Sequence, residues 1–83
     1  MITLVFSVYD EKAQAFMQPF FAHSRGLAVR QLSGISDPEH PFVKWPEDFR
    51  LYCLGHFDDA RGVIVASDQP DLVCDLCLIY SKE

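Results

Sequence analysis

"FRLYCLGHFDDARGVIVA", residues 49–66, decides the fold, because two runs of β-forming residues flank a short polar loop. Residues 49–57 and 62–66 are rich in aromatic, aliphatic and β-branched side chains, which favour strands. The connecting Asp-Asp-Ala-Arg, followed directly by glycine, is typical of a hairpin loop. The stretch therefore predicts two antiparallel strands, and Asp58 and Asp59 are interpreted as solvated turn residues rather than as a catalytic carboxylate pair.

A second hairpin is predicted near the start of the sequence. Residues 2–9, ITLVFSVY, are mostly β-branched or aromatic and alternate in part, which indicates a strand. Residues 10–14 are polar and fit a turn or one helical turn, and residues 15–23 return as extended chain. Pro19 lacks an N–H, so the returning run is expected at an edge of the sheet. One face of the first run carries Ile2, Leu4, Phe6 and Val8, and the other carries Val5 and Tyr9.

Residues 24–36, SRGLAVRQLSGIS, have the pattern of an amphipathic helix. Ala28, Leu32 and Ile35 recur at the spacing that forms an apolar stripe along one helical face. Ser24 can accept hydrogen bonds from the free N–H groups of the first turn, which makes it the predicted N-cap. We therefore expect one helix in the middle of the chain.

Two further segments are less regular. Residues 37–48 contain three prolines and are predicted to form a loop, which Phe42 and Trp45 hold against the core. Residues 68–81 fit either a helix that begins near Pro70 or a final strand, and we favour the helix. The residues that would share one face of that helix are Leu72, Val73, Leu76 and Tyr80.

These elements predict a single small α+β domain over residues 1–83, with a mostly antiparallel sheet built from two β-hairpins and with one or two helices. Hydrophobic residues make up 49% of the chain and aromatic residues 13%. A chain of 83 residues buries only a modest share of its surface, so some of this apolar material is expected to be covered by another copy. We therefore predict a homo-oligomer.

Charge is distributed unevenly along the chain. The formal net charge is −5, yet residues 1–36 carry three basic and two acidic residues, whereas residues 37–83 carry four basic and ten acidic ones. Proteins that coat nucleic acids are normally basic, so any DNA contact is expected in the N-terminal part. The sequence shows no signal peptide and no long apolar run, and three cysteines suit a reducing compartment. We expect a soluble cytoplasmic protein without membrane contact.

Four potential zinc ligands occur in two pairs with the spacing of structural zinc sites: Cys53 with His56, and Cys74 with Cys77. Residues three apart on a regular strand point to opposite faces, so Cys53 and His56 converge only if the strand is broken at Gly55. Cysteine is also commonly buried as a small hydrophobic residue. We therefore interpret the cysteines as packed thiols, and expect neither a metal nor any other cofactor.

Basic and aromatic residues of the N-terminal part form the candidate binding set. No nucleophile elbow, glycine-rich loop or Ser/His/Asp grouping is present, so an enzyme is not expected. Arg25 lies in the first turn of the predicted helix, where free N–H groups favour anions such as phosphate. Nearby aromatic rings can stack on unpaired bases, and an aromatic core with solvated charges around it is the alternative interpretation. The candidate nucleic-acid-binding residues are Tyr9, Lys12, Phe21, His23, Arg25 and Arg30.

Several short motifs, taken in their order and spacing, resemble a family of phage proteins. They are Ser-Val-Tyr-Asp-x-Lys-Ala at 7–13, Pro-Phe-Phe at 19–21, Gly-x-Ala-x-Arg at 26–30, Pro-Glu-Asp at 46–48 and Leu-Gly-x-Phe-Asp at 54–58. Together they resemble the small non-structural protein of gokushoviruses, which are single-stranded DNA phages of the microvirus group. The resemblance covers roughly residues 5–64 and does not include Cys53 or His56 among its motif residues.

The resemblance implies an early phage protein, located in the cytoplasm of the bacterial host, that binds DNA or assists viral single-strand synthesis. It implies no catalytic residue. We hypothesise weak binding of single-stranded DNA by a homo-oligomer, in which repeated basic patches raise the avidity. The alternative is an acidic protein-interaction module that docks to a phage or host replication protein, or to the procapsid, without touching DNA. Weakening of DNA binding by salt distinguishes the two.

Overall fold

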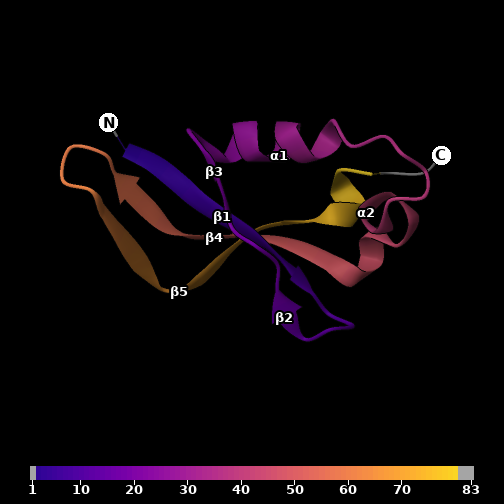
Figure 1. Cartoon of the computed structure of the whole chain (residues 1–83). Coiled ribbons are helices and arrows are strands. Elements are labelled where there is room, and N and C mark those ends of the chain that lie inside the picture. Colours follow the sequence, from indigo (N-terminus) through magenta and orange to yellow (C-terminus); the bar gives the residue numbers. More distant parts are fainter. Residues whose placement is uncertain (1, 81–83) are drawn as a thin grey trace.

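One antiparallel sheet forms the framework of the molecule (Figure 1). The computed structural model describes residues 2–80, so the domain predicted over residues 1–83 extends beyond them at both ends. The sheet order is β2-β1-β4-β5, and β3 pairs with β1 beyond the end of β2, which confirms the predicted α+β class. The strands are β1 (Ile2–Asp10), β2 (Ala15–Phe16), β3 (Phe20–Ala22), β4 (Phe49–Asp58) and β5 (Val63–Asp75).

Both predicted hairpins are present. In the first, the Asp10 carboxylate accepts hydrogen bonds from the backbone N–H groups of Lys12 and Ala13, and the chain returns as β2 and β3. In the second, β4 and β5 flank a short loop that ends at Gly62, whose φ of 68° is left-handed and favours glycine. Both turns therefore lie at the positions that the sequence predicts.

One helix and three shorter helical segments of the described chain lie over one face of the sheet. The helix α1 (Arg25–Ser33) begins as predicted, because the Ser24 hydroxyl accepts a hydrogen bond from the N–H of Leu27. Side chains from α1 pack on those strand residues that alternate toward it. Among the described residues, no helix is long and apolar enough to cross a membrane. The buried core cluster is Phe6, Val8, Ala22, Ala28, Leu32, Phe42, Phe49, Leu51, Cys53 and Leu76.

The segment predicted as a loop, residues 37–48, contains two short helices instead. They are α2 (Pro41–Lys44) and the 3-10 turn η1 (Pro46–Asp48), and each begins with a proline, whose fixed φ suits a first helical position. Phe42 is buried as expected. The prediction for Trp45 is wrong, because its side chain is 48% exposed and lies beside the ammonium group of Lys44 rather than in the core.

The prediction of a helix over residues 68–81 is also wrong. The strand β5 continues to Asp75, and the 3-10 turn η2 (Leu76–Leu78) follows it. Residues 67–70 lie between two paired stretches of β5, where only Leu54 of β4 stands opposite them. Pro70 is tolerated in this irregular stretch of an edge strand, where its missing N–H removes no regular ladder bond. The last residue of the predicted segment lies outside the described residues.

Candidate functional site

The face of the sheet that points away from the core cluster is lined by aromatic side chains. Along β1 this face is made by the residues that alternate with Phe6 and Val8. The strand register places Phe57 opposite Thr3, Tyr52 opposite Ser7, and Phe16 opposite Tyr9. We call this surface the aromatic face; its rings are Tyr9, Phe16, Phe21, Tyr52 and Phe57.

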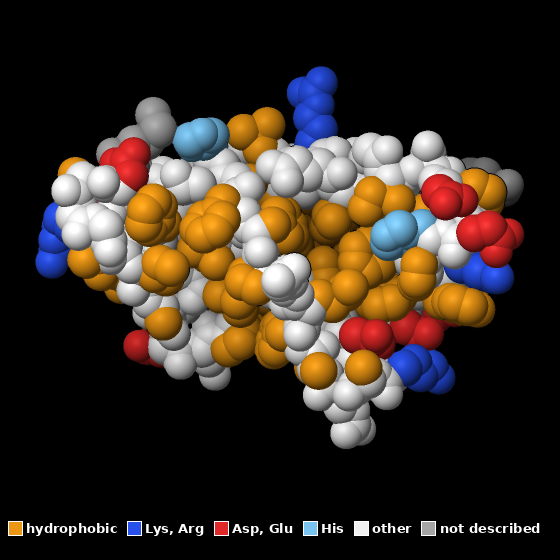
Figure 2. Space-filling model, viewed as in Figure 1, with side chains coloured by type: hydrophobic (Ala, Val, Ile, Leu, Met, Phe, Trp, Pro, Cys, Tyr) orange, Lys and Arg blue, Asp and Glu red, His pale blue; other side chains and the backbone are white. Residues whose placement is uncertain are grey.

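The rings of the aromatic face form two clusters. At one end the ring centre of Phe16 lies 4.9 Å from that of Tyr9 and 5.5 Å from that of Tyr52. At the other end the rings of Phe21 and Phe57 are 6.0 Å apart and nearly perpendicular. Phe16 is 42% exposed and Phe21 is 47% exposed, so each cluster presents ring surface to solvent. Figure 2 shows hydrophobic side chains across the middle of the surface in view, with charged side chains around its margins.

A crossing of the main chain separates the two clusters. Ser7 lies on the aromatic face and is nevertheless completely buried, and its hydroxyl donates a 2.6 Å hydrogen bond to the carbonyl of Met17, which lies against it. The N–H of Met17 in turn donates to the carbonyl of Val8. Residues 17–19, between β2 and β3, therefore cover the centre of this face and leave its two ends open.

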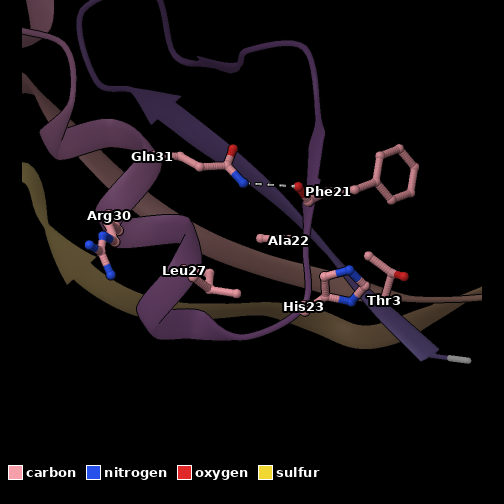
Figure 3. Close-up of a pocket in the computed structure, with 7 residues that line it drawn as sticks. All are labelled: Thr3, Phe21, Ala22, His23, Leu27, Arg30 and Gln31. Carbon is pink, nitrogen blue, oxygen red and sulfur yellow. Dashed lines mark hydrogen bonds between the residues drawn. The ribbon is translucent and has the colours of Figure 1, made fainter.

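A hollow of about 440 Å³ lies beside the Phe21 end, between α1, β3 and the start of β1 (Figure 3). Gln31 crosses it and donates a 3.4 Å hydrogen bond to the carbonyl of Phe21. In Figure 3 the side chain of Leu27 points toward β3, while the guanidinium of Arg30 and the ring of His23 lie on opposite sides of it. The polar groups therefore line the margin of an apolar hollow rather than converge on one atom. The lining residues are Thr3, Phe21, Ala22, His23, Leu27, Arg30 and Gln31.

Three of the six candidate residues, Phe21, His23 and Arg30, line this hollow together. Tyr9 lies on the same face of the sheet but in the other ring cluster, and Lys12 is exposed on the turn after it. Arg25 lies apart from this group, because its guanidinium pairs with Asp71 of β5, and this hydrogen bond raises its pKa. The predicted set is therefore divided: Tyr9 and Phe21 lie on the aromatic face, whereas Arg25 and Arg30 belong to α1 on the other side of the sheet, and Arg25 is paired with a carboxylate.

Sequence reasoning missed three residues of the site, Phe16, Tyr52 and Phe57. Each lies within a segment predicted to be extended, so the signal that was available is side-chain alternation. Alternation alone does not say which face of β4 matches which face of β1, because that depends on the pairing register. The register aligns Tyr52 with Ser7 and Phe57 with Thr3.

The expectation that Cys53 and His56 point to opposite faces is wrong, because β4 has an irregularity at Leu54. The register runs from Phe6 opposite Cys53 to Leu4 opposite His56, which places both side chains on the core face. Within residues 2–80, no group of three or more His, Cys, Asp or Glu side chains is arranged to hold a metal ion. The break that we named as the condition for convergence is thus present, but the ligand set is not.

The three thiols differ in environment. Cys53 is buried, and its thiol donates a 3.7 Å hydrogen bond to the carbonyl of Gly55. Cys74 is half-buried, and burial, helped by the charge of Asp75, raises the pKa of its thiol. Cys77 is exposed. The buried thiol fits the predicted packing role, and the elevated pKa disfavours a reactive thiolate at Cys74.

Comparison with protein families adds one finding. A family model described as the phage ORF5 protein matches residues 3–79, which is almost the whole chain. Comparisons with curated proteins and with solved structures found no match.

Proposed function

The chain belongs to the phage ORF5 protein family, and from this premise we propose that it binds single-stranded DNA during viral replication in the cytoplasm of the bacterial host. The proposed phage is of the gokushovirus type, as the motif resemblance implies. The role is one of binding, with no catalytic step. Bases would stack on the two ring clusters of the aromatic face, and phosphates would lie along the basic side chains beside them.

One observation carries this proposal: aromatic rings stand at both ends of a sheet face that none of the described helices covers. Proteins that bind single strands without sequence preference combine such stacking rings with cationic side chains. His23 and Arg30 lie beside the Phe21 cluster, and Lys12 follows the Tyr9 cluster in sequence. Unpaired bases suit this surface, because its rings are too few and too exposed to form a second core.

The charge of the protein sets the strength of binding. With a net charge of −5 and few cationic side chains near the rings, Lys12 and Arg30 among them, few phosphates can be neutralised. Each neutralised phosphate of a single strand contributes roughly −0.7 to the slope of log K against log salt concentration. We therefore expect weak binding with a slope no steeper than about −2.

Fluorescence anisotropy of a labelled oligonucleotide at low salt tests the proposal. Removal of a stacking ring typically weakens single-strand binding by about 1–3 kcal/mol, so Phe16→Ala and Phe21→Ala should each raise Kd roughly 5- to 150-fold. Arg30→Gln should weaken binding less and reduce the salt slope by about 0.7. Trp45→Ala is the matched control, because Trp45 is an equally exposed aromatic residue outside the face. An unchanged anisotropy for the unsubstituted protein, or equal losses in all aromatic variants, would overturn the proposal.

A protein-interaction module is the second candidate, and one observation favours it. Seven acidic side chains between residues 37 and 75 are exposed, and they suit a partner with a basic surface, such as a phage or host replication protein. Titration of the purified phage replication initiator in place of the oligonucleotide distinguishes the candidates. If the protein is an interaction module, it should still bind the initiator after Phe16→Ala and should lose this binding when the acidic residues are reversed in charge. The exposed acidic residues are Asp37, Glu39, Glu47, Asp59, Asp68, Asp71 and Asp75.

A further inference from the structure

The outer edge of β5, like that of the short strands β2 and β3 at the other side of the sheet, has no paired strand among residues 2–80. β5 is the last strand in the sheet order and pairs only with β4. In Figure 1 no other element runs along its outer side. Val63, Ile64 and Val65 are 37%, 61% and 41% exposed, although all three are β-branched residues that normally occur inside sheets.

Only half of this edge is protected against pairing with another chain. Edge strands are usually blunted by charged residues, proline or bulges, because their free N–H and C=O groups otherwise bind a further strand. Residues 67–70 of β5 have all three features: Asp68, Pro70 and an irregular pairing opposite Leu54. Residues 63–66, Val-Ile-Val-Ala, have none of them. The open part of the edge is therefore a short apolar segment.

We propose that residues 63–66 pair in antiparallel fashion with the same residues of a second copy of this chain. The opposite charges on either side of the segment favour a second copy of this chain as the partner. Arg61 precedes the segment and Asp68 follows it, and within the described part of the chain neither side chain forms an ion pair. When the segment pairs with itself around a two-fold axis at Ile64, each Arg61 comes opposite Ser67 of the second copy and therefore next to the position of Asp68.

The two-fold axis of such a pair has a consequence for the aromatic faces. An axis that relates two antiparallel edge strands is perpendicular to the sheet, so it keeps each face on its own side. The aromatic faces of both copies therefore look the same way and form one longer surface. If the proposed DNA binding is correct, on which this step rests, a single strand that spans both copies gains avidity without any new type of contact.

Sedimentation velocity of the DNA-free protein over a wide concentration range tests the pairing. The unsubstituted chain should shift from monomer to dimer as concentration rises. Ile64→Lys places two ammonium groups next to each other at the axis, and we expect it to raise the dimer Kd at least about ten-fold. Leu78→Lys is the matched control, because Leu78 is 77% exposed on η2, and it should dimerise normally. A protein that stays monomeric throughout, or a dimer that Ile64→Lys leaves intact, would overturn the proposal.

A charge exchange tests the register of the pair. Arg61→Asp and Asp68→Arg should each weaken the dimer about two- to five-fold for every ion pair lost, which is the range for exposed pairs. The double variant Arg61→Asp/Asp68→Arg should restore it, and a double variant weaker than both single variants would contradict the register. Circular dichroism confirms folding of each variant. Sedimentation and anisotropy together separate the two proposals. A protein that binds DNA but stays monomeric at every concentration rejects only the pairing, and a protein that dimerises but gives no anisotropy change with DNA rejects only the DNA binding.

Discussion

The two faces of the sheet are built by the same strands and differ in what covers them. On the core face Phe6 and Leu51 are completely buried beneath α1 and the short helices. On the aromatic face Phe16 and Phe21 keep more than two fifths of their surface in water. Burial of apolar area stabilises a fold, and exposed rings contribute little to it. The comparison teaches that the aromatic content of this chain serves stability on one face and is available for binding on the other.

The largest expected difference is in stability, when one aromatic ring is truncated on each face. Phe6→Ala leaves a cavity in the core and should lower the free energy of unfolding by about 3–5 kcal/mol. Phe21→Ala removes a half-exposed ring that contacts Phe57, and should lower it by about 1 kcal/mol. Urea denaturation followed by circular dichroism measures both. Equal losses would show that the aromatic face is as important for stability as the core.

An intermediate loss of stability is expected on substitution of Gly55, where the backbones of β4 and β5 approach each other closely. A Cβ added to this residue would lie 2.1 Å from the carbonyl oxygen of Val65 in the neighbouring strand. Gly55→Ala should therefore force β4 and β5 apart and destabilise the fold by about 1–3 kcal/mol. Gly62→Asn is the control, because Asn tolerates the left-handed turn and nothing lies within 4 Å of the added atom. If both variants denature at the same urea concentration, the close approach of β4 and β5 is not maintained in solution.

The smallest effect on stability is expected from loss of the Tyr80 hydroxyl, which lies at the end of the core face. Tyr80 donates a hydrogen bond to the carbonyl of Leu32 on α1, and Tyr80→Phe should remove about 1 kcal/mol. Burial raises the pKa of Tyr80, so the unfolded chain releases this proton at a lower pH than the folded chain. Stability from this group is therefore complete below about pH 10 and is lost as the pH rises through the folded pKa.

Denaturation at several alkaline pH values checks this sign. The unsubstituted protein should lose stability more steeply above pH 10 than Tyr80→Phe does. Tyr52→Phe, on the aromatic face, retains Tyr80 and should retain the steeper loss. Parallel curves for the unsubstituted protein and Tyr80→Phe would show that the Tyr80 hydroxyl is exposed to water in solution.

Local sequence signals predicted much of the fold. The hairpin around residues 59–62, the strand over residues 2–9 and the Ser24 cap each depend on neighbouring residues, and each is present. The errors arise where the deciding contact is distant in sequence. β5 continues past Pro70 because its outer side has no partner and tolerates a missing N–H, which the local sequence does not reveal.

The site was predictable only in part, for the same reason. Phe21, His23 and Arg30 were found together because β3 and α1 are joined by a short connection, so closeness in sequence becomes closeness in space. Tyr52 and Phe57 join the face only through the register between β1 and β4. The irregularity at Leu54 shifts that register by one residue and reverses the face expected for His56 relative to Cys53. The residue pattern of one β-strand does not reveal its pairing register with another.

The pairing of β1 with β4 also sets the order of events in folding. Ile2 pairs with Asp58, so β1 is completed by a strand that is synthesised well after it. Contacts that join distant parts of a chain form slowly, because a long loop must be closed before any of them is made. Until β4 emerges, the aromatic strand β1 has only the short β2 and β3 as partners. The sheet is therefore completed only when β4 has been made, and until then the exposed β1 is prone to aggregate.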